Sequence, residues 1–283
     1  MQDSKSRSGA DKCVSASSVS GGSKVVAFCD TSLNLKETIK IKGREIFPNF
    51  MGENMNRLDT IIKYVDANKV VADIGSDHGI TAIKVYEEKN PKKVIATDIS
   101  KDSLQKLIDK LEYSKYDIKT IVTDGIADID EDMDIIIISG MGGYLIAKIL
   151  DEGILQAKKS EKLILQPNNS QEYLRTWLHD NAFDIIDEDM SEDDNFIYNI
   201  IIAVPDEDGI AEKYENPDYY KYGKFNFEKK YLLFLKSLNK EKQHLSDIYD
   251  KIKDKDTDEA EMRKEELLKE IKNIEEILWK LEK

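Results

Sequence analysis

The sequence predicts an α/β fold with a seven-stranded, mostly parallel sheet, followed by a C-terminal antiparallel helical hairpin that resembles a coiled coil. Three observations lead to this prediction. Short apolar or β-branched segments alternate with segments whose apolar residues recur at helical spacing. Glycine-rich or polar clusters follow the first five of these short segments. Beyond them, leucine and isoleucine recur in a heptad-like pattern within a charged region.

The first predicted strand, Lys69–Asp73, is too short and too rich in β-branched residues for a helix. Apolar residues of segment 80–86 then recur at helical spacing, so the unit reads strand, tight turn, helix. The turn Asp73–Gly79 contains Gly75 and Gly79, which let the backbone approach a ligand closely. The start of the following helix offers N–H groups to the same ligand.

The charge of this turn indicates which nucleotide it binds. The dinucleotide fingerprint G-x-G-x-x-G would need glycines at positions 75, 77 and 80, but Asp77 and Ile80 stand at the last two. A pyrophosphate would meet the Asp77 carboxylate, which disfavours NAD, whereas a positively charged sulfonium would be attracted to it. The turn therefore favours S-adenosylmethionine, and an ordinary βα turn with chance glycines is the alternative.

Two further strands each end in an aspartate. The strand Lys93–Thr97 runs into Asp98, 25 residues after Asp73, close to the spacing at which an acidic residue binds ribose hydroxyls in doubly wound folds. The strand Ile118–Val122 runs into Asp124, whose side chain is a candidate acceptor for an adenine amino group.

The fourth strand, Asp134–Ser139, is a continuous apolar run, as expected for a central parallel strand covered on both faces. It leads into Gly140–Gly143, where little side-chain bulk lets a flat substrate base lie against the backbone. A flexible turn before the helix Tyr144–Leu150 is the alternative.

The fifth strand, Lys162–Leu165, ends in Gln166–Asn169, whose amides can donate and accept along a base edge, although solvation of a surface loop explains them as well. A helix at about Ser170–Asp180 and two extended segments, Phe183–Met190 and Asn195–Val204, complete the predicted sheet as an antiparallel pair. Ligands on such sheets bind beyond the carboxyl ends of the strands, where all the clusters above fall.

Three motifs in this order resemble those of the bacterial tRNA (adenine-22-N1)-methyltransferase family, a group of class I, Rossmann-like, S-adenosylmethionine-dependent enzymes. They are Asp-Ile-Gly-Ser-Asp-His at Asp73–His78, Gly-Met-Gly-Gly at Gly140–Gly143 and Leu-Gln-Pro-Asn at Leu165–Asn168. Asn56–Leu58 also resembles the start of the family's domain, and the resemblance covers about Asn54–Lys283.

The resemblance implies methyl transfer to N1 of adenine 22 in the D-arm region of tRNA, with Asp77 as the leading catalytic residue. His78 is the second catalytic candidate, a hydrogen bond at the helix start being its alternative role. The expected cofactor-binding residues are Asp73, Gly75, Ser76, Gly79, Asp98, Ile99, Asp124, Gly125 and Gly140. The expected substrate-binding residues are Arg57, Met141, Gly142, Gly143, Tyr144, Gln166, Pro167 and Asn168.

The sequence divides into three predicted parts. Serine and glycine crowd the start of residues 1–50, which we interpret as a disordered leader and a candidate cloning remnant or product of a mis-set start codon. Residues 51–227 form the expected methyltransferase domain. Residues 228–283 form the expected hairpin, which either packs on that domain or grips the RNA. Its apolar positions are Leu238, Leu245, Ile252, Leu267, Ile271, Ile274, Leu278 and Leu281.

Composition bounds the cellular setting. No apolar stretch approaches the roughly 20 residues that cross a bilayer, so we expect no membrane segment. Both cysteines, Cys13 and Cys29, lie in the leader, so we expect no disulfide and no cysteine-ligated metal in the folded part, and a cytoplasmic location. We also expect no metal cofactor and a monomer.

The formal net charge of −14 disfavours binding of an RNA substrate, because the phosphate backbone and an acidic surface repel each other. Local lysine clusters compensate only modestly. Two alternatives therefore stay open: a methyltransferase of the same fold acting on a small molecule or another RNA, and a non-catalytic adaptor that works through the hairpin.

Overall fold

A computed structural model describes residues 39–41, 44–46, 55–229 and 231–282 of the chain. Internal contacts divide the chain into two units, Met1–Gly52 and Glu53–Lys283. In the first unit, β1 (Ile39–Ile41) and β2 (Arg44–Ile46) form a short antiparallel pair. The remainder of the predicted disordered leader lies outside the described residues.

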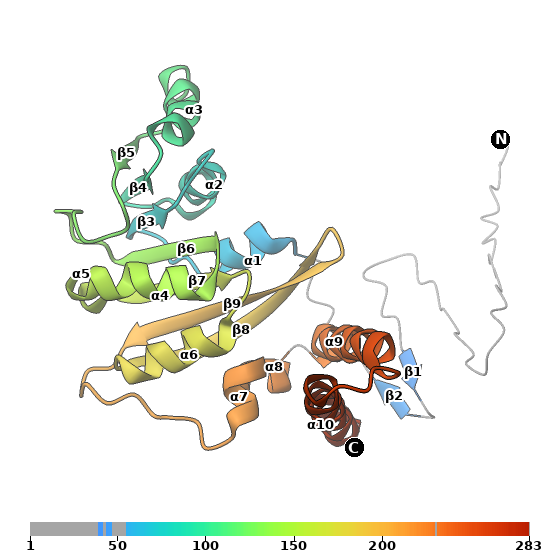
Figure 1. Cartoon of the computed structure of the whole chain (residues 1–283). Coiled ribbons are helices and arrows are strands. Elements are labelled where there is room, and N and C mark those ends of the chain that lie inside the picture. The colour runs from blue at the N-terminus through green and yellow to red at the C-terminus, as the bar shows by residue number, and fades with distance from the viewer. Residues whose placement is uncertain (1–38, 42–43, 47–54, 230, 283) are drawn as a thin grey trace, which may run out of the picture. The chain divides into compact units, whose positions relative to one another are not determined.

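The second unit is built on a seven-stranded sheet of order β5-β4-β3-β6-β7-β9-β8 (Figure 1). The first five strands in this order are parallel, and β9 runs antiparallel to both β7 and β8. This confirms the predicted fold, and each strand lies within three residues of its expected bounds. The strands are β3 (Val70–Ile74), β4 (Lys93–Asp98), β5 (Ile118–Val122), β6 (Ile135–Met141), β7 (Lys162–Pro167), β8 (Phe183–Asp193) and β9 (Phe196–Pro205).

Helices follow most of the parallel strands, whereas β5 is connected to β6 by a segment without a helix. The described helices of this unit are α1 (Arg57–Lys63), α2 (Ile80–Lys89), α3 (Lys101–Glu112), α4 (Gly143–Glu152), α5 (Ile154–Lys159), α6 (Gln171–Asp180), α7 (Pro217–Tyr222), α8 (Lys224–Lys229), α9 (Tyr231–Ile252) and α10 (Asp258–Leu281). The sequence did not predict α5, α7 and α8, because six residues are too few to show a helical period.

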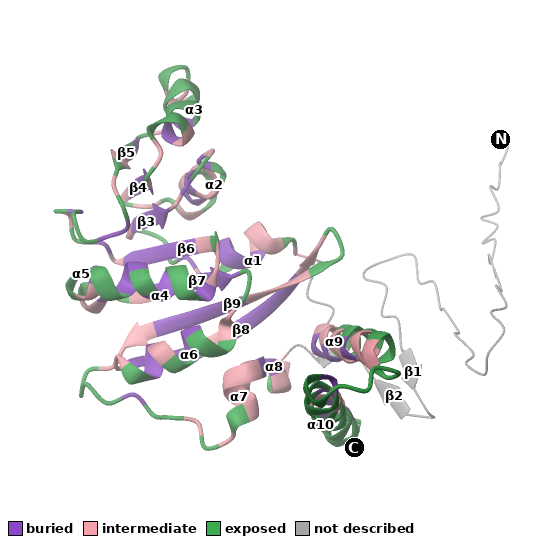
Figure 2. Cartoon of the chain, in the orientation of Figure 1, coloured by how far each residue is buried: buried purple, intermediate pink, exposed green. Residues whose placement is uncertain are grey.

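The central strand β6 carries the core on both faces of the sheet. Ile136 and Ile138 belong to one hydrophobic cluster, and Ile135 and Ile137 belong to the other. All four side chains are fully buried (Figure 2). Because successive side chains of a strand point to opposite faces, an uninterrupted apolar run is what a doubly covered strand requires.

The C-terminal helices α9 and α10 pack against each other as the heptad pattern predicted. Their contact buries Leu238 and Leu245 of α9 and Leu267 and Ile274 of α10. The same cluster includes Met190 of β8, so the hairpin also packs on the sheet. This is one of the two roles expected for the hairpin, and RNA binding by it stays a prediction.

A buried ion pair joins α6 to β8. The Arg175 Nε atom lies 2.6 Å from Glu188 Oε1, and both side chains are 1% exposed. Arg175 Nη1 also donates to the carbonyl oxygens of Tyr220 and Lys221, and Glu188 Oε2 accepts from the Phe225 N–H. This cluster therefore fixes the α7–α8 segment, which leads into the hairpin, to the edge of the sheet.

Candidate functional site

The turn after β3 adopts the conformation that its glycines predict. Gly75, Asp77 and Gly79 have φ angles of 71°, 46° and 72°, in the left-handed region. The Ser76 N–H donates to the Thr97 carbonyl at 2.7 Å, which ties the turn to β4. Gly79 caps α2 without a side-chain hydrogen bond, and α2 begins at Ile80. The helix start therefore presents backbone N–H groups to the edge of the sheet at which the parallel strands end, which we call the rim.

Asp73 lies beneath this turn. Its side chain is 2% exposed, and Ser76 Oγ donates to its Oδ2 at 2.5 Å. Burial raises the pKa of the Asp73 carboxyl to about 6, although the hydrogen bonds from Ser76 and from the Ala82 N–H act in the opposite direction. Asp73 thus shapes the turn from inside, and its predicted contact with the cofactor stays a prediction.

The raised pKa of Asp73 predicts a pH-dependent stability. The protonated form is favoured in the folded state, so its stabilisation is complete below the unfolded pKa near 3.8 and is lost as the pH rises through about 6. From pH 4 to pH 7 the free energy of unfolding should fall by about 2 kcal/mol relative to Asp73→Asn, which does not titrate. Urea unfolding of both proteins at several pH values measures this difference, and a constant difference would contradict the assignment.

Asp98 stands at the end of β4 and braces the turn. Its Oδ2 accepts from the Asp77 N–H at 3.1 Å, and its Oδ1 accepts from the Ser100 N–H at 2.8 Å. Ile99 beside it is 67% exposed. At the end of β5, Asp124 is exposed and Gly125 is buried with a φ of 87°. The sheet topology therefore places the predicted cofactor residues along one edge.

The two catalytic candidates lie side by side on this edge. Asp77 is 58% exposed, and its Oδ2 is 3.4 Å from His78 Nε2. The His78 imidazole faces Asp77, and the His78 carbonyl accepts from Lys110 Nζ. Both roles expected for His78, catalysis and a hydrogen bond at the helix start, stay predictions.

The Gly-Met-Gly-Gly loop and the Gln-Pro-Asn loop are joined by hydrogen bonds. Gln166 Oε1 accepts from the Gly140 N–H at 3.0 Å and from Arg57 Nη1 at 3.1 Å. Gln166 Nε2 donates to Asn168 Oδ1, and Asn168 Nδ2 donates to the Gly140 carbonyl at 2.7 Å. The Asn168 N–H donates to the Met141 carbonyl at 2.7 Å. Predicted substrate residues from three distant segments thus form one network.

This network corrects the role expected for Gln166 and Pro167. Gln166 is fully buried, and protein groups take both ends of its amide, so it is not free to bind a base edge. Pro167 is also buried. Gln166 instead positions Gly140 and Asn168, and Asn168 is exposed. Sequence alone could not show this, because an amide that follows a strand looks the same whether it faces solvent or the neighbouring loop.

The two glycine motifs meet at Met141. A Cβ added to Gly75 would lie 2.0 Å from Met141 Cε, so the β3 turn and the loop after β6 are in direct contact. Gly142 faces Asn169, and a Cβ on Gly143 would lie 2.4 Å from the Ser170 carbonyl oxygen. These glycines therefore allow close approach of backbones, and the predicted cofactor turn lies against the predicted substrate loop.

Tyr144, in the first turn of α4, is 62% exposed and lies against Tyr173 of α6. The sequence reasoning missed Tyr173. Its only signal was its place in the first turn of a helix that starts at the same edge.

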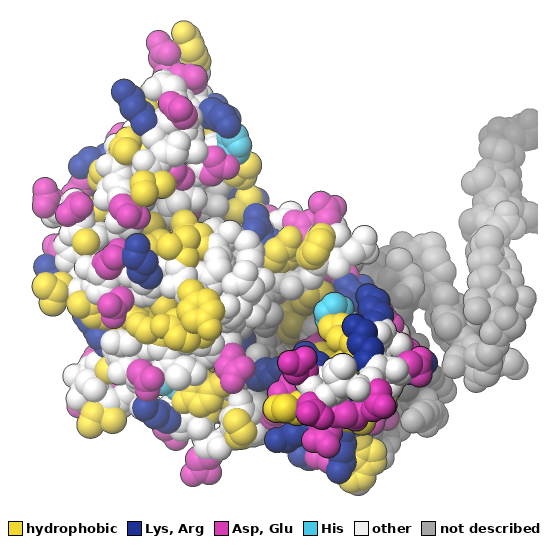
Figure 3. Space-filling view, in the orientation of Figure 1, with side chains coloured by type: hydrophobic (Ala, Val, Ile, Leu, Met, Phe, Trp, Pro, Cys, Tyr) yellow, Lys and Arg dark blue, Asp and Glu magenta, His cyan; other side chains and the backbone are white. Residues whose placement is uncertain are grey.

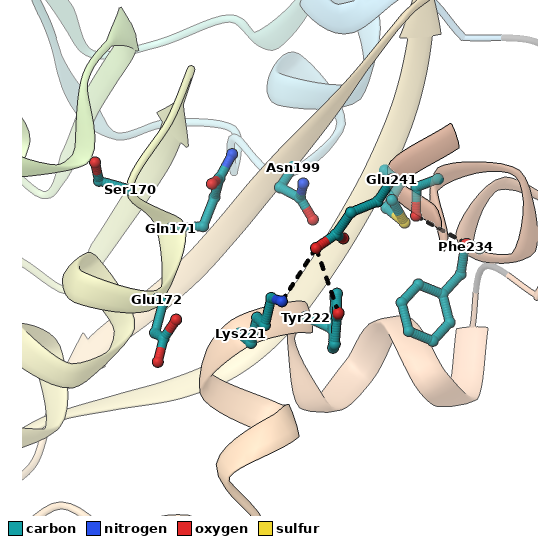
Figure 4. A pocket seen from close by; sticks show the side chains of 10 residues that line it. Ser170, Gln171, Glu172, Asn199, Lys221, Tyr222, Phe234 and Glu241 are labelled. Atoms are coloured by element: carbon teal, nitrogen blue, oxygen red, sulfur yellow. Dashed lines mark hydrogen bonds and ion pairs between the residues drawn. The ribbon is translucent and has the colours of Figure 1, made fainter. Parts of the chain in front are cut away.

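Two cavities lie away from these motifs. One, of about 390 Å³, lies between the start of α6, α7 and α9 (Figure 4). Lys221 and Tyr222 both point to Glu241 there, at 3.1 and 3.5 Å. The other, of about 940 Å³, surrounds Tyr214 and the start of β8. Neither is lined by a predicted site residue, and the predicted residues lie along the edge of the sheet instead.

The charged side chains at the rim favour a cationic ligand. Segments 73–79, 98–99 and 124–125 contain four aspartates and no lysine or arginine. Within the part of the chain that the structure describes, no three histidine, cysteine or acidic side chains gather as a metal site. No helix of that part is long and apolar enough to cross a membrane.

Comparison with known proteins places this site in a family. The fold and the rim define a class I, S-adenosylmethionine-dependent methyltransferase. The family model TrmK, tRNA (adenine(22)-N(1))-methyltransferase, matches residues 71–276. The chain belongs to this family.

Individual relatives agree with the family model. The tRNA (adenine(22)-N(1))-methyltransferase of Bacillus subtilis (strain 168) is 31% identical over 228 residues, which cover 78% of this chain and 95% of the relative. The crystal structure of B. subtilis TrmK superposes with a TM-score of 0.68 at 31% identity, covering 78% of this chain and 97% of that one. Streptococcus pneumoniae Sp1610 in complex with S-adenosyl-L-methionine gives a TM-score of 0.68 at 28% identity, covering 79% and 100%.

Proposed function

We propose that this protein transfers the methyl group of S-adenosylmethionine to N1 of adenine 22 in tRNA, at the junction of the β3 turn and the Gly140–Gly143 loop. The observation that carries this proposal is the contact between Gly75 and Met141. A transfer reaction needs its two reactants side by side, and positioning supplies most of the rate of a displacement at carbon.

The rim residues suit the cofactor. S-adenosylmethionine, when bound, supplies an electrophilic methyl group on a positively charged sulfur. We assign the uncapped start of α2, with Gly75, Ser76 and Gly79, to its amino-acid end, and Asp98 with Ile99 to its ribose. The exposed Asp124, with Gly125, is assigned to its adenine. Asp73 supports the turn from below.

Asp77 is the proposed catalytic residue. Adenine N1 already carries a lone pair, so no base has to remove a proton before the new N–C bond forms. The methylated base is cationic, and the exposed Asp77 carboxylate can stabilise that charge or hold the exocyclic amine. His78 lies close enough to orient the carboxylate.

The loop after β6 is the proposed site of the target base. Gly140, Met141 and Gly142 leave the backbone open, and Asn168 presents an amide at the same edge. Arg57 holds this edge through Gln166. The base has to leave its stack to reach the rim, at a cost of a few kcal/mol.

We propose a monomer in the cytoplasm, where a folded part without cysteine is suited to reducing conditions.

Mass spectrometry of nucleosides tests this function. Purified protein, labelled cofactor and a tRNA with adenine at position 22 should yield 1-methyladenosine, and the same tRNA with guanine at that position should yield none. Methylation elsewhere would indicate another RNA target. Cofactor binding in calorimetry without any tRNA methylation would indicate a small substrate, and absence of cofactor binding would indicate an adaptor.

A further inference from the structure

An exposed pair of tyrosines stands beside the proposed site. The ring centroids of Tyr144 and Tyr173 are 4.2 Å apart, and the ring planes are tilted by 39°. Tyr144 and Tyr173 are 62% and 42% exposed, so both remain accessible to a ligand. In the space-filling view, hydrophobic side chains gather over α4 (Figure 3). The pair thus presents aromatic faces to the outside.

The backbone fixes this pair firmly. The Gly143 N–H donates to the Asn169 carbonyl at 2.9 Å, and the absence of a Cβ at Gly143 brings it against the Ser170 carbonyl. The starts of α4 and α6 therefore lie side by side, and each helix carries its tyrosine in the first turn. A rigid pair of rings loses little conformational freedom when a flat ligand stacks on it.

The place of the pair along the rim indicates which base it would meet. In the sheet order β3-β6-β7, Gly75 follows β3 and the Gly140–Gly143 loop follows β6. The tyrosines lie beyond that loop, toward β7, because Tyr144 directly follows Gly143 and Tyr173 lies in the first turn of α6, which begins four residues after β7 ends at Pro167. The proposed function places the target adenine where Gly75 contacts the Gly140–Gly143 loop. The tyrosine pair therefore lies where the next base of the RNA strand is expected.

We propose that Tyr144 and Tyr173 form a stacking platform for the nucleobase adjacent to the target adenine in the tRNA. This inference rests on the proposed function. Tyr144 was already expected to bind substrate, and the structure adds Tyr173 and the pairing of the two rings. Aromatic side chains bind unstacked bases with little sequence preference, because every base has a π-face. The platform would also hold the RNA strand open while the target base is displaced.

Alanine substitutions test the platform through substrate affinity. Tyr173→Ala and Tyr144→Ala should each raise the KM for tRNA roughly tenfold, with the Kd for S-adenosylmethionine unchanged. Tyr173→Phe should retain the wild-type KM, because stacking needs the ring and not the hydroxyl. Tyr113→Ala is the matched control, since Tyr113 is 88% exposed at the opposite end of a rim helix, α3, and should leave KM unchanged.

A fluorescent base separates stacking from a purely structural role. A tRNA with 2-aminopurine beside position 22 should lose fluorescence on binding the wild-type protein and should keep it with Tyr173→Ala. A fall in thermal stability with unchanged KM and unchanged quenching would show that the pair only joins two helices, and would overturn the platform. If the wild-type protein itself does not methylate tRNA, the proposed function fails; if it does and the variants match it, only the platform fails.

Discussion

Asp77→Ala is expected to lower kcat for tRNA methylation by about 10²- to 10³-fold, the range seen when one preorganised group that stabilises transition-state charge is removed. The Asp77 carboxylate is exposed at the rim and is the acidic group of the turn whose side chain is not committed to the fold. Its contribution to the turn comes from its backbone N–H, which bonds Asp98 whatever the side chain is. The Kd for S-adenosylmethionine should therefore change little.

The backbone at Asp77 requires a second variant. With a φ of 46°, alanine adds strain that asparagine largely avoids. Asp77→Asn keeps the shape and removes the charge, so it should lose most of the activity while retaining wild-type thermal stability. Asp109→Asn, an exposed change on α3, is the matched control. Turnover of both Asp77 variants at the wild-type rate in a tritiated-methyl assay would remove Asp77 from the mechanism.

Arg175→Ala is expected to destabilise the protein by about 3 to 5 kcal/mol, because it leaves the Glu188 carboxylate buried without its counter-ion. Both side chains are 1% exposed, and the guanidinium also holds two carbonyl oxygens of the α7–α8 segment. Guanidinium chloride unfolding measures the loss.

Two comparison variants test the cause of this destabilisation. Arg263→Ala removes an exposed helix-surface pair with Glu266 and should cost less than about 1 kcal/mol. Arg175→Met combined with Glu188→Gln removes both charges and should recover part of the stability lost in Arg175→Ala. A loss below about 1 kcal/mol for Arg175→Ala would show that the pair contributes little.

Local pattern was enough to predict the sheet. Each parallel strand is a short apolar or β-branched segment, and the run Ile135–Ile138 is what a strand covered on both faces requires. The ends of β6 and β7 extend further than predicted, because glycine and amide residues there carry no apolar signal while the ladder hydrogen bonds continue. The neighbouring strands determine where such a strand ends, and the sequence of one segment does not show which strands will be its neighbours.

The sequence predicted that the candidate residues gather at one edge of the sheet, but it did not predict which of them are buried within the protein. The glycines and aspartates that follow the strands predicted a ligand-binding edge, because parallel strands bring their carboxyl ends together. The burial of Gln166 and of Arg175 depends on neighbours distant in sequence, and the exposure of Tyr173 depends on the close approach of two helices. The sequence alone does not show whether a polar side chain will form its hydrogen bonds with water or with other protein groups.

β8 and β9 form a long antiparallel ribbon that connects the C-terminal helices to the parallel strands. At its turn, Lys236 and Lys240 of α9 hold Glu192 and the Asn195 carbonyl. Further along, β9 pairs with β7 up to Leu165, the residue before Gln166. This ribbon therefore connects the α9–α10 hairpin to β7, the strand that ends at Gln166 and Pro167, through one continuous set of hydrogen-bonded strands.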